Sequence, residues 1–112
     1  MDLDLRHDEE ASRYELRDSG RTVAFIEYRV EGDHGERLVM HHTYVEPARR
    51  REGLAAMLVE RALDDVRSSG RVVVPTCWYV AEFMDARPEY AEIRRTAGAR
   101  SAPSLPRDAA VE

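Results

Sequence analysis

The sequence predicts one α/β (α+β) domain, in which an antiparallel meander precedes a β-α-β crossover and a second helix. Short runs of β-forming residues, separated by turns that contain glycine, occupy the chain before residue 46. Apolar residues then recur at helical spacing from Gly53 onward, and a run of valines follows Gly70. At 112 residues the chain is long enough for a single hydrophobic core and too short for two.

Three strands are expected before the helix. They are Arg13–Arg17, Thr22–Val30 and Arg37–Val45, and the turns between them lie at residues 18–20 and 31–36. Connections this short join neighbouring antiparallel strands, so the first part of the domain is expected to be a meander.

The crossover follows directly. A helix is expected from Gly53 to Gly70, with apolar positions at Ala55, Val59, Ala62 and Val66. A strand over Arg71–Cys77 carries valines without alternation, which is typical of a strand buried on both faces. A second helix is expected over Trp78–Ala86, before Pro88.

The chain ends are predicted to lie outside the domain. Residues 1–7 are charged and are expected to be flexible, residues 8–95 form the domain, and residues 96–112 lack periodicity and are expected to be a disordered tail.

Composition excludes several classes of function. All 17 basic residues are arginines and the net charge is -5, which argues against non-specific binding to nucleic acid or to an anionic membrane. One cysteine allows no internal disulfide, and no apolar run reaches the roughly 18 residues of a membrane helix. The acidic start lacks the pattern of a signal peptide, so a cytoplasmic protein is expected.

The most informative segment is Arg49–Arg51, which precedes the first helix. A helix start carries partial positive charge and unpaired N–H groups, so cations are disfavoured there, and no capping side chain stands just before Gly53. This combination predicts an anion site, and phosphate is the expected anion. The crossover should bring His42, Tyr44 and Cys77 to the same sheet edge.

The motif itself separates this site from common phosphate loops. The sequence contains neither GxxxxGK[ST] nor GxGxxG. Residues 50–55 instead form R-x-x-G-x-A, which resembles the pyrophosphate-binding signature [QR]-x-x-G-x-[GA] of the GNAT acetyltransferases. The flanking stretches His42–Pro47, Pro75–Val80 and Arg87–Tyr90 look like the short Yjdj-type GNAT domain, and the resemblance covers residues 8–95.

This resemblance implies a site for acetyl-CoA, with no metal. Arg50 would hold the leading position of the motif, and Val45 would pair its backbone with the pantetheine arm. The backbone around the loop would bind the pyrophosphate. The implied cofactor-binding residues are Val45, Arg50, Arg51, Glu52, Gly53, Leu54, Ala55 and Tyr79.

Two positions depart from the family pattern. Many relatives carry glycine where this chain has Arg51, which either restricts the loop or adds a cation for the 3'-phosphate of CoA. Relatives often carry a carboxylate where this chain has Tyr44, so a carboxylate base is missing at that position.

Two residues are candidates for catalysis. His42 is the candidate general base, because imidazole titrates near neutrality, although a histidine that only hydrogen-bonds within the sheet is the alternative. Cys77 stands at a strand end before a helix, where a thiolate is favoured, and it either carries the acyl group or lines the acetyl pocket. Tyr79 and Tyr90 could protonate a leaving thiolate or could simply pack.

The function that the resemblance implies is acetyl-CoA-dependent N-acetyl transfer to an unidentified amine, either a small molecule or a protein. Two alternatives remain at this stage. One is a non-catalytic acyl-CoA-binding or sensing module, and the other is an interaction domain for a different phosphorylated ligand.

Overall fold

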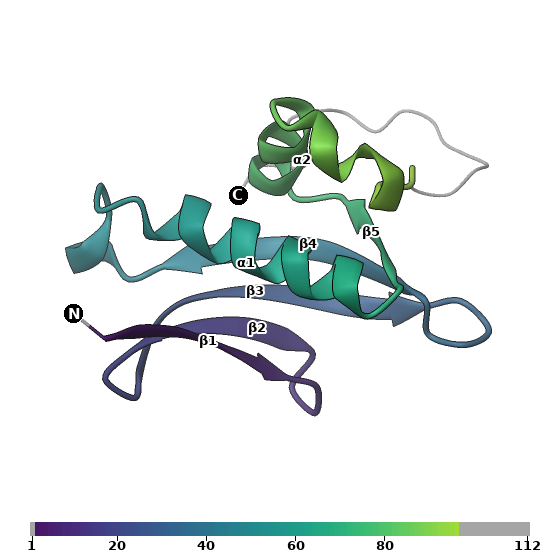
Figure 1. Ribbon diagram of the computed structural model, residues 1–112. Helices are drawn as coiled ribbons and strands as arrows, with labels where there is room; N and C mark the ends of the chain where they lie inside the picture. Colours follow the sequence, from purple (N-terminus) through teal and green to yellow (C-terminus); the bar gives the residue numbers. More distant parts are fainter. Residues whose placement is uncertain (1, 97–112) are drawn as a thin grey trace.

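A five-stranded sheet in the order β1-β2-β3-β4-β5 forms the frame of the protein. The computed structural model describes residues 2–96. The first four strands pair antiparallel in sequence, and β5 pairs parallel with β4 (Figure 1). The strands are β1 (Leu3–Asp8), β2 (Arg13–Asp18), β3 (Arg21–Glu31), β4 (Arg37–Val45) and β5 (Val72–Pro75).

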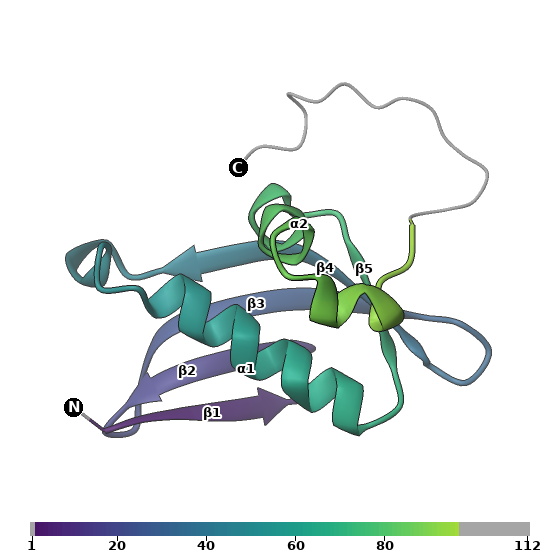
Figure 2. The same cartoon turned by 45° about the horizontal axis from the view of Figure 1, so that its top comes forward.

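One long helix crosses the sheet, and the shorter helices lie beside it (Figure 2). The helical elements are η1 (Pro47–Arg49), α1 (Leu54–Ser68), α2 (Trp78–Asp85) and η2 (Pro88–Ile93), where η denotes a 3₁₀ helix. The predicted fold class is therefore confirmed: a meander, a β-α-β crossover and a second helix follow one another in the expected order. Within residues 2–96, no helix is long and apolar enough to span a bilayer.

The N-terminal strand corrects the expectation of a flexible segment over residues 1–7. Leu3–Asp8 pairs with β2, and Leu3 and Leu5 pack against the core. High charge hid the period-two pattern, because Asp4 and Arg6 point to solvent between the inward leucines. The ordered fold thus begins before residue 8. The predicted tail lies outside the described residues, apart from Thr96.

The core lies between α1 and one face of the sheet. Of the predicted apolar stripe of α1, Val59, Ala62 and Val66 are buried, whereas Ala55 is half-buried. Its members meet strand residues that are equally buried, and this removal of apolar surface from water is the main stabilising contribution. The facing residues are Leu54, Leu58, Ala62 and Val66 on α1, and Leu16, Ile26, Met40 and Val73 on the sheet.

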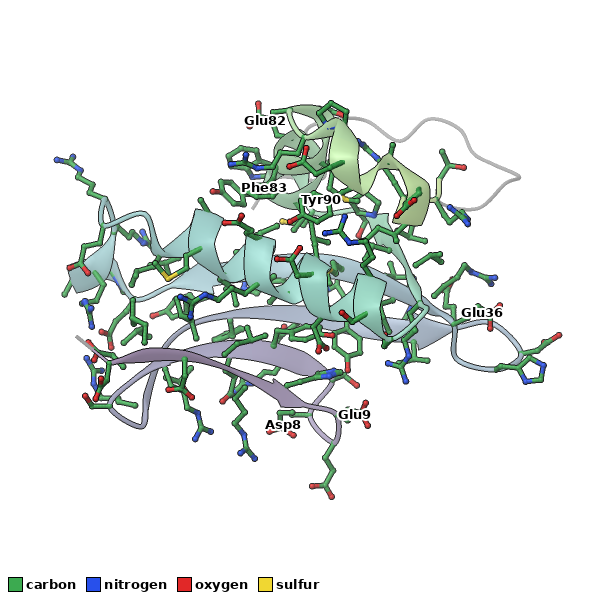
Figure 3. The ribbon with its side chains drawn as sticks, viewed as in Figure 1. Asp8, Glu9, Glu36, Glu82, Phe83 and Tyr90 are labelled. Carbon is green, nitrogen blue, oxygen red and sulfur yellow. The ribbon has the colours of Figure 1, made fainter. Side chains whose placement is uncertain are left out.

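Two tyrosines fix the C-terminal half of α1. The Tyr14 hydroxyl on β2 donates to Asp65 Oδ2 at 2.7 Å, and the Tyr90 hydroxyl on η2 donates to Asp64 Oδ1 at 2.8 Å. Burial and the nearby carboxylates raise the pKa of Tyr90 to about 12, and they raise the pKa of Tyr14 as well. Figure 3 shows Tyr90 pointing from η2 toward α1. The sequence leaves two roles for Tyr90, as a proton donor to a thiolate or as a packing residue. Its buried ring and its hydrogen bond to Asp64 fit the packing role.

A buried carboxylate lies on the sheet face that α1 does not cover. Glu15 is 2% exposed, and it accepts hydrogen bonds from Arg13 Nε at 2.8 Å and Arg17 Nε at 3.0 Å. Burial alone would raise the pKa of Glu15, but the two guanidinium groups outweigh it and hold the pKa below the ordinary value. The charge is thus compensated within the sheet.

We predict that Glu15→Gln lowers the free energy of unfolding by about 2 kcal/mol near neutral pH, because it removes the buried negative charge and sets an amide NH2 against one of the two guanidinium groups. A carboxylate with a depressed folded pKa stabilises the protein above its unfolded value, 4.5, and this contribution is lost as the pH falls through the folded pKa. Urea unfolding at a series of acidic pH values should therefore show that the free energy of unfolding falls less steeply with decreasing pH in the variant than in the wild type.

Glu31→Gln is the matched control, since Glu31 pairs with Arg29 on an exposed part of the sheet. An exposed pair contributes at most about 1 kcal/mol, so this control should behave like the wild type. Equal acid profiles for wild type and Glu15→Gln would contradict the prediction.

Candidate functional site

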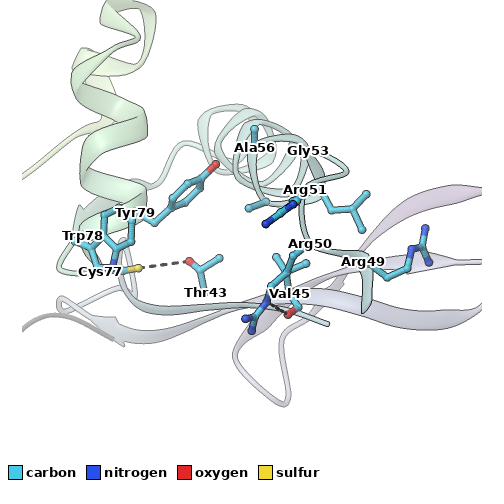
Figure 4. Close-up of a pocket in the computed structure, with 12 residues that line it drawn as sticks. Thr43, Val45, Arg49, Arg50, Arg51, Gly53, Ala56, Cys77, Trp78 and Tyr79 are labelled. Carbon is cyan, nitrogen blue, oxygen red and sulfur yellow. Dashed lines mark hydrogen bonds between the residues drawn. The ribbon is translucent and has the colours of Figure 1, made fainter. Parts of the chain in front are cut away.

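A cavity of about 540 Å³ lies between the end of β4, the start of α1 and the start of α2 (Figure 4). Its wall is drawn from segments that are far apart in the sequence. The lining residues are Thr43, Val45, Arg49, Arg50, Arg51, Gly53, Leu54, Ala55, Ala56, Cys77, Trp78 and Tyr79.

The cavity exists because the parallel pairing of β4 and β5 stops at Met40, opposite Pro75. The N–H groups of Thr76 and Cys77 both donate to the Met40 carbonyl, at 3.1 and 3.0 Å, and the chain then enters α2. β4 continues to Val45 and, within residues 2–96, pairs there with β3 alone. The other edge of its last residues therefore borders the cavity.

A β-bulge at His41 decides which side chains of β4 enter the cavity. Tyr28 lies opposite Met40, whereas Glu27 lies opposite His42, so His41 is one extra residue in the strand. An extra residue reverses the alternation of faces for every later position.

After the bulge, Thr43 and Val45 face the cavity, whereas His42 and Tyr44 lie on the opposite face of the sheet. The ring centroids of His42 and Tyr44 lie 6.1 and 5.1 Å from that of Phe25. The sequence predicts the His42 and Tyr44 side chains at the same sheet edge as Cys77, and the structure does not bring them there. Neither side chain lines the cavity, because the bulge turns both away from it.

One end of the cavity, the thiol end, is formed by Cys77, Thr43, Trp78 and Tyr79. Cys77 is 5% exposed, and its Sγ lies 3.5 Å from Thr43 Oγ1. Trp78 is 49% exposed, which is unusual for so large an apolar side chain, and it forms part of the rim. Burial raises the pKa of Tyr79, so its hydroxyl keeps its proton near neutral pH. Sequence reasoning missed Thr43, since only the bulge directs it inward.

The other end, the arginine end, contains the exposed start of α1. Gly53 has φ +79° and stands at the N-cap without a side-chain cap, as the sequence predicts. Met57 N–H donates to Gly53 O at 3.2 Å, and the N–H groups of Leu54, Ala55 and Ala56 find no acceptor within residues 2–96. Unpaired N–H groups at a helix start favour an anion. The Leu54 side chain itself is buried in the core, so it offers only its backbone here.

The first arginine of the cluster holds the loop in place. Arg49 Nη1 lies 3.1 Å from Asp18 Oδ2, and Arg49 Nε lies 3.0 Å from Glu52 Oε1. Figure 4 shows the Arg49 side chain extending away from the thiol end. Glu52, an expected cofactor-binding residue, does not line the cavity, because its side chain serves this ion pair. Arg49 therefore ties the loop to the turn after β2.

The second arginine covers the free edge of β4. Arg50 Nε donates to the Val45 carbonyl at 3.0 Å. Glu46 N–H donates to Val23 O on β3, so by alternation the N–H and carbonyl of Val45 point away from β3 and toward the cavity. Val45 thus directs its N–H toward the cavity at the position where the sequence predicts a ligand arm, and Arg50 holds its carbonyl.

The third arginine has an unusual backbone. Arg51 has φ +77°, a left-handed conformation that glycine adopts without steric cost. Its side chain lines the cavity, and it forms no hydrogen bond or ion pair with any residue in 2–96. Arg51 thus takes, as an arginine, the backbone conformation that favours the glycine expected at this position.

A family model described as GCN5-related N-acetyltransferase matches residues 13–93, most of the described chain. The chain belongs to this family. Protein NATD1 of Gallus gallus is similar to this GCN5-related N-acetyltransferase at 31% identity over 90 residues, with 77% of each chain covered. Protein NATD1 of Homo sapiens is 32% identical over 88 residues, covering 75% of this chain and 74% of that protein.

Solved structures share the fold of this GCN5-related N-acetyltransferase. A GCN5-like protein from Staphylococcus aureus has a TM-score of 0.63 at 15% identity, covering 88% of this chain and 94% of that one. A ribosomal-protein-alanine N-acetyltransferase from Brucella melitensis has a TM-score of 0.51 at 22% identity, covering 85% and 67%. The predicted family and the predicted class of enzyme, an acetyltransferase, are confirmed. Within residues 2–96, no cluster of three His, Cys, Asp or Glu side chains could hold a metal ion.

We predict that Arg51→Gly stabilises the protein by about 1 kcal/mol, because glycine removes the steric cost of the left-handed backbone. Thermal unfolding of the free protein measures the change. Arg61→Gly is the control: Arg61 lies inside α1, where glycine should cost about 1 kcal/mol instead. A destabilised Arg51→Gly variant would show that the arginine side chain contributes more to the fold than its backbone costs.

Proposed function

We propose that the protein transfers an acetyl group from acetyl-CoA to an amine. The observation that carries this proposal is one cavity with unpaired N–H groups and three arginines at one end and a thiol at the other. The free edge of β4 runs between these ends, so an extended ligand can reach from one to the other.

In this proposal the arginine end binds the pyrophosphate. The N–H groups of Leu54, Ala55 and Ala56 donate to phosphate oxygens, and Gly53 and Ala55 leave room for that close approach. The Arg50 guanidinium also binds the phosphates. To do so, it gives up its hydrogen bond to the Val45 carbonyl. The backbone of Val45 then pairs with the pantetheine arm, and Tyr79 closes the side of the cavity.

At the thiol end, the amine nitrogen forms a bond to the acetyl carbon, the bond to sulfur breaks, and the amine loses a proton. Tyr79 is the proposed donor to the departing thiolate, because its hydroxyl is protonated and lines the cavity. Cys77 is the better placed of the two catalytic candidates, either as acyl carrier or as a wall of the acetyl pocket. Thr43 is the positioning residue for its sulfur.

His42 keeps its proposed role as general base on one condition. Since it lies on the sheet face opposite the cavity, the amine must approach from that face. The acceptor stays an unidentified amine, and the proposal includes a cytoplasmic location without nucleic-acid or membrane partners.

A sensing or acyl-CoA-binding module without catalysis is the second candidate, and one observation favours it. No histidine or carboxylate is among the cavity-lining residues, so the described cavity holds no ordinary general base. A third possibility, a different phosphorylated ligand, would appear in the binding experiment as equal affinity for ATP.

We predict that acetyl-CoA binds and changes the fluorescence of Trp78, the only tryptophan of the chain, which lies on the cavity rim. Gly53→Ala should weaken this binding about tenfold, because a methyl group then stands among the N–H donors. Titration with acetyl-CoA, CoA and ATP gives the affinities. Binding of ATP as tight as that of CoA would contradict the proposed ligand.

Gly70→Ala is the matched control for this variant. Gly53 and Gly70 flank the same helix with φ of +79° and +78°, and a Cβ at either would meet nothing within 4 Å. Both variants therefore carry the same backbone cost, while only Gly53→Ala should lose affinity. Equal loss of affinity in both would assign the effect to the fold and not to the site.

We predict that Cys77→Ala lowers kcat on an accepted amine about a hundredfold and leaves the affinity for acetyl-CoA within twofold. Amine acetylation is followed by thiol release. Mass spectrometry without an acceptor then tests the carrier role, since a carrier thiol gains one acetyl group and a pocket wall gains none. A protein that binds acetyl-CoA but acetylates no class of amine would favour the sensing module.

A further inference from the structure

We propose that Arg51 binds the phosphate monoester at the far end of CoA, the 3'-phosphate, and makes the site selective for CoA over its 3'-dephosphorylated form. This inference rests on the proposed function. The 3'-phosphate is a part of the ligand to which the proposed function assigns no residue.

The arginines next to Arg51 are already engaged. Arg49 is 17% exposed, and it pairs with Asp18 and Glu52, so its charge is compensated within the protein. Arg50 donates to Val45 O, at the strand edge where the pantetheine arm would lie. Arg51 lines the same cavity and has no such partner within residues 2–96.

The backbone of Arg51 is left-handed. At φ +77° glycine would be preferred on steric grounds, yet the chain carries an arginine there. Backbone strain of this kind persists where the residue serves function, so the inference runs from the observed conformation to a role for the side chain. The fold gains nothing visible from that side chain, because it makes no contact with an acid or a carbonyl in the described residues.

The 3'-phosphate carries charge that the groups binding the pyrophosphate do not neutralise. The pyrophosphate can be satisfied by the N–H groups at the start of α1 together with Arg50. A phosphate monoester carries more negative charge than either of those phosphates and presents three acceptor oxygens. On a chain of net charge -5, such a group needs a local cation, and Arg51 is an exposed cation of the cavity lining that pairs with no residue in 2–96.

The test compares the affinities of CoA and 3'-dephospho-CoA, measured by calorimetry or by Trp78 fluorescence. The wild type should bind CoA about tenfold more tightly, as one charge-assisted contact implies. Arg51→Gln and Arg51→Gly should both bring the two affinities within twofold. Because glycine relaxes the backbone and glutamine does not, agreement between them assigns the effect to the charge.

Three further variants complete the experiment. Arg51→Lys should restore most of the preference, since it keeps the charge without the bidentate geometry. Arg50→Gln should weaken both ligands by the same factor, and Arg61→Gln, on the exposed side of α1, should change neither.

Two results separate the inference from the function beneath it. Tight binding of both ligands without a preference, or a preference that survives Arg51→Gln, would overturn the role of Arg51 and leave the acetyl-CoA site intact. Absence of binding for both ligands would overturn the proposed function and the inference together.

Discussion

The main-chain carbonyl of Met40 is the point on which the site depends. It accepts hydrogen bonds from the N–H groups of Thr76 and Cys77 and from the Thr76 hydroxyl. A parallel ladder normally gives each carbonyl one donor from the neighbouring strand. Here several donors meet at one oxygen, so β5 leaves the sheet and β4 goes on without it. The divergence creates the cavity, exposes the edge of Val45, and turns Cys77 toward Thr43 at the entrance to α2.

The stability of α1 and its ligand-binding end are separated along the helix. Its C-terminal half is held by hydrogen bonds from Tyr14 and Tyr90 to adjacent aspartates, and its apolar stripe is buried. Its N-terminus has no side-chain cap and only backbone donors at the cavity. A helix that is fixed at one end can leave the other unsatisfied, and the donors are then already oriented when an anion arrives.

Local periodicity was enough to predict the meander, the crossover and the start of α1, because each depends on residues close in sequence. The absence of a capping side chain before Gly53 likewise predicted the uncapped helix start. Arg50, Gly53 and Ala55, which the motif assigns to cofactor binding, line the cavity there. What sequence reasoning missed depends on partners that are distant in the chain. The bulge at His41 is defined only against Tyr28 and Glu27, so the inward position of Thr43 and the outward position of His42 could not be derived. Strand β1 was missed because its charged residues obscure the alternation of its leucines. The ion pair between Arg49 and Asp18 was missed because the two residues are thirty-one positions apart in the sequence.

Asp18 links three parts of the molecule that seem independent in the sequence. One carboxylate oxygen accepts from the Asp2 N–H at 3.3 Å, and the other lies 3.1 Å from Arg49. These contacts outweigh partial desolvation and hold the pKa of Asp18 below its ordinary value, so the carboxylate stays charged. The edge strand β1, the β2–β3 hairpin and the arginine loop therefore share one anchor. An affinity tag fused ahead of Asp2 that displaced the Asp2 N–H would remove one contact of the carboxylate that positions the arginine loop. The end of the chain at which a tag is fused therefore matters for the binding site.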